Sequence, residues 1–474
     1  MPDENEDQSK NEQKPTSTEG KDYFGNNKSS DGTTSRSLGT DSGSIGTERK
    51  AATGAGTVAP AVGGGSKRDL ALLTAAHAET HVQTAAYSVL YPYIMQSLNF
   101  GVVELGALIS ASSLVGGLLQ GIHGWLSRWV KRKALCGAGN IFVGLSLALA
   151  GLASNFPFFG AARVGGSVAA SPQHPVAASL MSDWYGSRKR GTSFSMHFAG
   201  GNVGTVVAPL AAGFLYVAVG WRNTLLLFGI PGIVIGSLVW IFLNDQRKAG
   251  TWYSSKSPKG AESEGQGKRL SYLSVVHNTN ALKLMLARAT TSVGRGLGII
   301  LTYVQLYFVK ELGFSAGLST VLITILTAGS VISPLLGGRL ADTLGLRRPI
   351  IIASLASGAL SLGLLIESGK YVPAVAISVV MLGLSVYNEG PLSQALLSEI
   401  VSDQEREGAY SLYFVISYAG SAMWGFVIAY VIFISSFATA FEMIMAANVA
   451  AIVIYSLVKE RDFRKNDIRP LPKG

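Results

Sequence analysis

Cysteine and charged residues are both scarce in this chain of 474 residues. Its one cysteine, Cys136, excludes a disulfide within the chain and a metal site made of several cysteines. Charged residues account for 14% of the sequence, against about 25% in a typical soluble domain. This deficit argues against an ordinary soluble protein.

Signatures of ATP hydrolysis and of metal-dependent catalysis are also missing. The sequence contains no Gly-x-x-x-x-Gly-Lys-Ser/Thr phosphate loop and no His-Glu-x-x-His string. His77-Ala-Glu79 resembles the start of a deaminase motif, but the Pro-Cys-x-x-Cys that completes such a motif is absent. We therefore expect no enzyme, no cofactor and no drive by ATP.

Long apolar runs fill the chain from Asp69 onward. Many of them reach the roughly 20 residues that a helix needs to cross the hydrocarbon core of a bilayer. Only helices and closed barrels satisfy their backbone polar groups in lipid, and these runs lack the alternation of barrel strands. We predict an all-α polytopic membrane protein with twelve transmembrane helices. The predicted spans are residues 69–97, 102–127, 133–153, 156–182, 192–219, 222–243, 282–309, 316–342, 349–367, 372–399, 408–434 and 436–457.

Polar segments divide this sequence into five regions. Residues 1–68 are too poor in apolar side chains to form a core, and we expect a disordered N-terminal tail. A six-helix half over 69–243 is followed by a polar linker over 244–281. A second six-helix half covers 282–457, and residues 458–474 form a C-terminal tail.

Basic residues gather in alternate loops, which accounts for the net charge of +10 without a nucleic acid partner. Such loops stay in the cytoplasm. We therefore expect a multi-pass protein of the plasma membrane, in contact with lipid, with both termini and the linker cytoplasmic. The basic loops contain Arg128, Lys131, Arg132 and Lys133; Arg188, Lys189 and Arg190; Arg247, Lys248, Lys256, Lys259, Lys268 and Arg269; and Arg339, Arg347 and Arg348.

A loop motif follows the eighth predicted helix. It reads Gly338-Arg-Leu-Ala-Asp342-Thr-Leu-Gly345-Leu-Arg347-Arg348 and resembles the signature Gly-x-Leu-Ala-Asp-x-x-Gly-x-Arg-Arg of the major facilitator superfamily. The loop after the second helix is a degenerate copy, with Arg128 in place of the aspartate and Lys131 in place of a glycine. The resemblance covers residues 69–457 and implies two pseudo-symmetric halves.

The resemblance marks Gly338, Asp342, Gly345, Arg347 and Arg348 as a gating loop. Glycine at a helix end permits a tight turn. Asp342 paired with Arg347 or Arg348 would form a cytoplasmic latch, and a plain solvated loop that anchors the topology is the alternative.

Helix five carries a run of small residues, from Gly200-Gly-Asn202-Val-Gly204 to Pro209 and Gly213. It resembles the Gly/Pro-rich motif of drug–proton antiporters in the superfamily. Small residues let neighbouring helices approach closely, so packing is the expected role. The same helix supplies His197 and Asn202 as polar candidates.

Charged residues deep within spans are expensive and indicate function. Arg295 and Glu389 lie near mid-depth of helices seven and ten, and Tyr387 and Asn388 stand beside Glu389. The resemblance implies that helices one, four, seven and ten line a central cavity, so Arg295 and Glu389 would face the same space. Their pair is either a structural ion pair or a switch that a substrate anion or a proton opens.

Other candidates lie on helices one, four and seven. Arg163 resembles an arginine often found in helix four of the superfamily, or it snorkels to the interface, as we expect for Arg288. His77 and His81 share one face of helix one and could relay protons, or they could simply form a polar lining near the cytoplasmic mouth. Glu79 points elsewhere and could be a proton carrier or a packing partner. Two histidines alone need further ligands for zinc, so no metal site is expected. Tyrosines that could line the cavity are Tyr87, Tyr303, Tyr387, Tyr413 and Tyr418.

These features predict a secondary transporter that moves a small organic solute by alternating access. Cations outnumber acids among the cavity candidates, which favours an organic anion, coupled to protons. A proton-driven exporter of lipophilic drugs and a non-transporting membrane receptor are the alternatives.

Overall fold

Helices account for the regular structure in the described part of the chain, with no strand among these residues. The computed structural model describes residues 65–127, 129–185, 187–245, 275–294, 299–402 and 406–460. Most of the predicted tails and linker, together with Arg128 and Arg295, lie outside these ranges. The residue boundaries proposed for the tails, linker and halves therefore remain predictions.

The helices follow one another with short connections. Their bounds are α1 (Lys67–Leu98), α2 (Val102–Leu126), α3 (Arg132–Gly151), α4 (Phe156–Ala170), α5 (Gln173–Trp184), α6 (Ser187–Phe242), α8 (Thr279–Thr290), η3 (Ser292–Gly294), α9 (Ile299–Leu306), η4 (Tyr307–Glu311), α10 (Ala316–Leu344), α11 (Arg348–Glu367), α12 (Val372–Val386), α13 (Glu389–Ile400), α14 (Arg406–Ile434) and α15 (Phe437–Ser456).

Breaks within spans explain why these elements differ from the twelve predicted helices. The fourth span is divided into α4 and α5 around Pro172, which has no N–H to continue the helix. The tenth span is divided into α12 and α13 at Tyr387 and Asn388. The fifth and sixth spans run together as α6, which changes direction at Gly220, whose φ of 77° is non-helical. The seventh span is divided into α8 and α9, with residues 295–298 outside the described ranges, and each predicted span thus has a counterpart among the described helices.

Apolar side chains cover much of the outer surface. Eight of the described helices are long and apolar enough to cross a membrane. Phe214, Val217 and Phe433 are each 68% exposed, an arrangement that water penalises and lipid does not. The fold class is therefore confirmed as an all-α polytopic membrane bundle.

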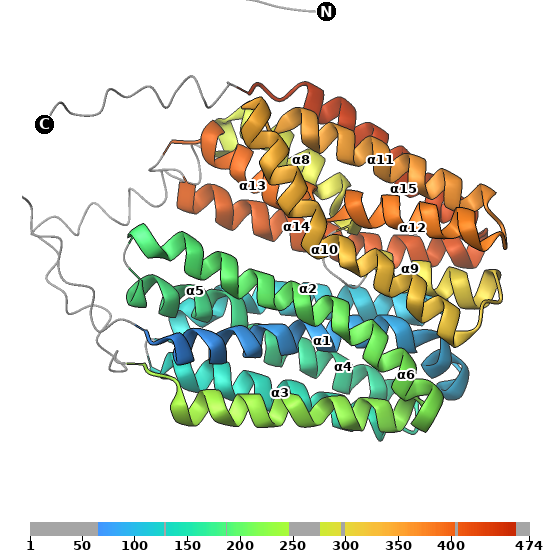
Figure 1. Ribbon diagram of the computed structural model, residues 1–474, viewed down its shortest axis with the longest axis horizontal. Coiled ribbons are helices and arrows are strands. Elements are labelled where there is room, and N and C mark those ends of the chain that lie inside the picture. Colours follow the sequence, from blue (N-terminus) through green and yellow to red (C-terminus); the bar gives the residue numbers. More distant parts are fainter. Residues whose placement is uncertain are drawn as a thin grey trace, which may run out of the picture. The chain divides into compact units, whose positions relative to one another are not determined.

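Two groups of helices make up the bundle, α1 to α6 and α8 to α15 (Figure 1). They meet where α2 packs on α14, α6 on α10 and α1 on α9. Asn202 on α6 donates a hydrogen bond of 3.1 Å to the carbonyl of Ser330 on α10. Ser110 on α2 donates to the carbonyl of Ala422 on α14 at 2.5 Å. Hydrogen bonds thus join the two groups along two of these three contacts.

Glycines set the closest helix contacts. A Cβ on Gly204 of α6 would collide with the backbone of Ala78 on α1. A Cβ on Gly329 of α10 would collide with the backbone of Gly383 on α12. The packing role predicted for the small residues of helix five is confirmed.

Candidate functional site

A cavity of about 380 Å³ opens between the two groups of helices. Its wall is formed mainly by α1, α2 and α4, with single contributions from α5 and α6, and it is closed on the other side by α9 and α14. Helices one, four and seven line it as expected. Helix ten does not, because none of the described lining residues belongs to α12 or α13.

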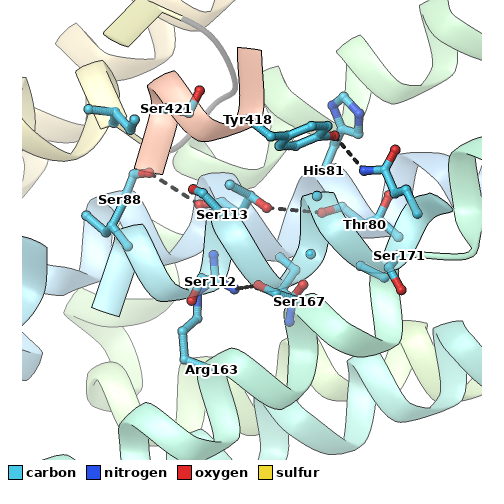
Figure 2. Close-up of a pocket in the computed structure, with 18 of the residues that line it drawn as sticks. Thr80, His81, Ser88, Ser112, Ser113, Arg163, Ser167, Ser171, Tyr418 and Ser421 are labelled. Carbon is cyan, nitrogen blue, oxygen red and sulfur yellow. Dashed lines mark hydrogen bonds between the residues drawn. The ribbon is translucent and has the colours of Figure 1, made fainter. Parts of the chain in front are cut away.

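Arg163 on α4 is the guanidinium of this cavity wall (Figure 2). Its side chain donates to the hydroxyl of Ser167 at 2.7 Å and to that of Tyr91 at 3.2 Å, and lies 4.9 Å from the ring centre of Tyr87. Arg163 is only 8% exposed, so it does not snorkel to the surface. Among the described residues no carboxylate forms an ion pair with it. The wall therefore keeps a positive charge that neutral partners orient without cancelling it.

Hydroxyl and amide groups cover much of the rest of the wall. They come from Thr80, Thr84 and Ser88 on α1, from Ser112, Ser113 and Gln120 on α2, and from Thr302, Tyr418 and Ser421 in the second group. Gln120 Nε2 donates to the hydroxyl of Tyr418 at 2.5 Å, across the boundary between the groups (Figure 2). Such a wall can offer many hydrogen bonds to a polyhydroxylated ligand.

Histidines lie beside the cavity. His81 lines it, whereas His77 is fully buried behind it, with 4.6 Å between their ring centres. The two rings share one face of α1, as predicted. Glu79 points elsewhere on α1, is 3% exposed, and its Oε1 has no hydrogen-bond partner within the described ranges.

Glu389 lies in a different place from the one predicted. It forms a buried ion pair with Arg288 on α8, and Tyr455 donates to its other oxygen at 2.6 Å. The expectation that Arg288 snorkels is wrong, because the side chain is only 5% exposed and lies inside the bundle, against Glu389 and the ring of Tyr413. The pair borders a separate pocket of about 40 Å³.

Tyr387 and Asn388, beside Glu389, lie at the break between α12 and α13. Asn388 donates to Ser354 on α11 at 3.2 Å, and its side chain packs where Gly337 of α10 has no Cβ. The hydroxyl of Tyr387 is buried and has no partner among the described atoms. Neither side chain reaches the large cavity, and Asn202 ties α6 to α10 instead of lining it.

Two equivalent ion-pair clusters lie where the third and ninth spans begin. Arg132, the first residue of α3, pairs with Asp183 at 2.7 Å and with Asp245 at 3.1 Å. Arg347, before α11, pairs with Glu399 of α13, and its N–H donates to Glu460 at 2.6 Å. We call these the loop clusters.

The ion pair of the gating loop is formed with a different acid from the predicted Asp342. Asp342 is exposed, and the ion pair of Arg347 is formed with Glu399. Partial burial lowers the pKa of Arg347, while the carboxylates of Asp342 and Glu460 raise it. The backbone N–H of Arg348 donates to Glu460 at 3.0 Å. The latch thus holds α11 to α13 and to the segment that follows α15.

The two glycines of this loop have different roles. Gly345 ends α10 with a φ of 71°, in the left-handed region that favours glycine. A Cβ on Gly338 would meet no atom within 4 Å, so close packing does not require glycine there. The tight turn predicted for this loop is confirmed at Gly345.

Among the described residues, two groups of helices around a polar cavity define a polytopic helical membrane protein of the kind that handles small solutes. The chain belongs to the Major Facilitator Superfamily, whose family model matches residues 76–387 and 284–473. This is a family of membrane transporters and not of enzymes.

Several curated proteins are similar to the chain. It is 27% identical over 168 residues to the "Probable L-galactonate transporter" of Escherichia coli, 35% of this chain and 37% of that protein. It is 22% identical to the "Hexuronate transporter" of Bacillus subtilis over 73% of this chain and 84% of that one. It is 23% identical to the "Membrane sensor protein UhpC" of Escherichia coli over 74% and 82%. The match to the first of these relatives thus spans little more than a third of that protein's length.

Solved structures share the fold. The "D-xylose-proton symporter" superposes with a TM-score of 0.68 at 15% identity, over 83% of this chain and 99% of that one. A mutant form of the "nucleoside transporter NupG" gives a TM-score of 0.64 at 14% identity, over 83% and 100%. At these identities the similarity concerns the fold alone.

Proposed function

We propose that this protein is a secondary transporter that moves a small organic anion across the plasma membrane by alternating access. The observation that carries the proposal is Arg163, a guanidinium that is 8% exposed, borders a polar cavity and has neutral partners. A carboxylate in the cavity would neutralise the charge of Arg163 through a bidentate hydrogen bond.

The cavity wall supports a polyhydroxylated carboxylate, such as a hexuronate or an aldonate, as the cargo. Its volume of about 380 Å³ lies in the range of small-molecule sites, about 300–1,000 Å³. Hydroxyls on α1 and α2 face it from one side and Tyr418 from the other. Two of the similar proteins are named as transporters of sugar acids, which supports the same class of cargo. A lipophilic drug would leave these polar groups without partners.

Proton coupling is the finer part of the proposal, and Glu79 is its carrier. Glu389 is held by Arg288 and Tyr455, which makes it a structural group. Glu79 is equally buried, and within the described ranges it has no ion pair. A Glu79→Gln variant should retain exchange of cargo across the membrane and lose accumulation driven by a pH gradient. Loss of both activities would contradict a role confined to coupling.

Flux into proteoliposomes tests the anion site. Arg163→Gln should lower kcat/KM for the cognate sugar acid by about 10- to 100-fold, the size of one hydrogen bond to a charged group. The matched control is Arg339→Gln, which removes the same charge from an exposed position on α10 and should leave flux unchanged. Equal flux in all three proteins would overturn the proposal.

A membrane sensor is the second candidate, and the similarity to the sensor protein over 74% of the chain favours it. A sensor would bind the sugar acid with the same dependence on Arg163 and carry no flux. Binding to the purified protein, measured beside flux in the same preparation, separates the two functions.

A further inference from the structure

Four of the six histidines of the chain meet beside the cavity, although they come from three helices. The ring of His77 on α1 lies 4.6 Å from that of His81, 4.9 Å from that of His174 on α5 and 4.3 Å from that of His197 on α6, between centres. One ring nitrogen each of His77, His81 and His174 lies within 4.8 Å of the others. We call these three residues the histidine triad.

A hydrogen bond fixes which nitrogen of His77 can bind a ligand. Its Nδ1 lies 3.0 Å from the backbone carbonyl of His197, which can only accept, so Nδ1 carries the proton. In the neutral ring Nε2 then has a free lone pair. This atom has no hydrogen-bond partner among the described residues. The His77 side chain is 0% exposed, so bulk water does not reach it either. A buried acceptor without a partner is expensive unless something fills its place.

The same logic applies to His81. The hydroxyl of Thr205 donates to the carbonyl of Gly201 at 3.2 Å, so its oxygen accepts the hydrogen bond of 3.0 Å from Nδ1 of His81. Nε2 of His81 is therefore also left with its lone pair. Metal-binding histidines usually have this arrangement, with one nitrogen on the metal and the other donating to a carbonyl or hydroxyl.

We propose that the histidine triad binds one divalent ion of the Zn²⁺ class, with Nε2 of His77 and of His81 as two of its ligands. Around a tetrahedral Zn²⁺ with bonds of about 2.0–2.1 Å, ligand nitrogens lie roughly 3.4 Å apart, so the rings close in slightly on binding. Imidazole ligands without a carboxylate suit Zn²⁺, Ni²⁺ or Cu²⁺ and not Mg²⁺ or Ca²⁺.

The site opens toward the cavity. His81 and His174 both line the cavity wall, whereas His77 closes the site from behind. An ion can therefore enter from the cavity and keep its fourth position for a water or for an oxygen of a bound anion. Gly201 makes room for the triad, since a Cβ there would lie 2.6 Å from the ring of His77. The bound ion would join α1 to α5.

Metal binding to the purified full-length protein, prepared without a polyhistidine tag, tests the site. Titration with Zn²⁺ in a calorimeter should show one ion per chain, and Co²⁺ should give the visible absorption of a tetrahedral complex. His81→Ala and His174→Gln should each weaken Zn²⁺ binding by more than about 100-fold, the upper end of the loss caused by removing a supporting residue. Thr205→Val, which removes such a support, should weaken it by about 10- to 100-fold.

His123→Gln is the matched control, because His123 on α2 is bonded to Ser171 and lies outside the triad. It should bind Zn²⁺ as the unchanged protein does. Thermal unfolding without metal shows that each variant is folded. Unchanged Zn²⁺ affinity in His81→Ala and His174→Gln, or Mg²⁺ binding as tight as that of Zn²⁺, would overturn the proposal. Because no flux is measured, this result is independent of the transport function.

Discussion

Arg163 and Arg288 are buried arginines, one from each half of the bundle, but only Arg288 of the second half has a described ion-pair partner. Arg163 in the first half lies on a cavity wall and is held by the hydroxyls of Ser167 and Tyr91. Arg288 in the second half is neutralised by Glu389, which Tyr455 also binds. One half thus keeps a charge for a ligand, and the other cancels its charge internally. Under the proposed function, the anion would bind the charge of the first half, and the second half would contribute neutral groups such as Thr302 and Tyr418 to the cavity.

The loop clusters, in contrast, are alike in the two halves. Arg132 binds one acid at the end of the fourth span and another after the sixth. Arg347 binds Glu399 at the end of the tenth span and Glu460 after the twelfth. The internal repeat has therefore kept its scaffold at the loops, and the halves diverge at the cavity.

The largest effect is expected from breaking the neutral pair of the second half. Arg288→Met leaves the carboxylate of Glu389 buried without its cation, which should cost about 3–5 kcal/mol of unfolding free energy. Titration of mixed micelles with dodecyl sulfate measures this free energy. The double variant Arg288→Met/Glu389→Gln should recover most of the loss. Equal losses in the single and double variants would show that the pair does not determine stability.

Stabilisation of the folded protein by a bound sugar acid should depend on Arg163 of the first half and not on the Arg288–Glu389 pair of the second. A sugar acid at 100 times its Kd stabilises a protein by about 2.7 kcal/mol if it binds only the folded state. We expect this gain in the unchanged protein and in the double variant of Arg288 and Glu389, and none in Arg163→Gln. The rise in Tm on addition of the anion measures it. Protection retained in Arg163→Gln would place recognition elsewhere.

Two glycines, one from each half, should differ in the sign of the effect of an alanine substitution. Gly204→Ala in α6 should destabilise by about 1–3 kcal/mol, because its Cβ would strike the backbone of Ala78. Gly338→Ala in α10 meets open space and should stabilise by about 0.5–1 kcal/mol through the lower backbone entropy of alanine. The same micelle titration measures both changes, and effects of the same sign would contradict the packing at Gly204.

The sequence predicted the fold far better than the site. Apolar runs and loop charges are local signals, so the spans and the family resemblance follow from them. The contacts of the cavity are not local, since Gln120 and Tyr418 are 298 residues apart. The position of Arg288 near a span end suggests the surface, whereas the side chain is buried by partners that are distant in the sequence, Glu389 and Tyr413. His77 and His81 are one helical turn apart in the sequence, whereas only the fold brings His174 to them.

The smallest effects should come from the loop clusters, and they should be equal. The side chains of Asp183 and Glu399 are 35% and 28% exposed, and pairs this accessible contribute about 0–1 kcal/mol. Asp183→Asn and Glu399→Gln should therefore lower the unfolding free energy by similar amounts, and high salt should reduce both losses. Asp342→Asn, whose carboxylate is exposed and forms no described ion pair, is the control. A large loss in Asp342→Asn would restore it as the partner that holds the gating loop, whereas unequal losses in the other two variants would show that the repeat has diverged at its loops as well as at its cavity.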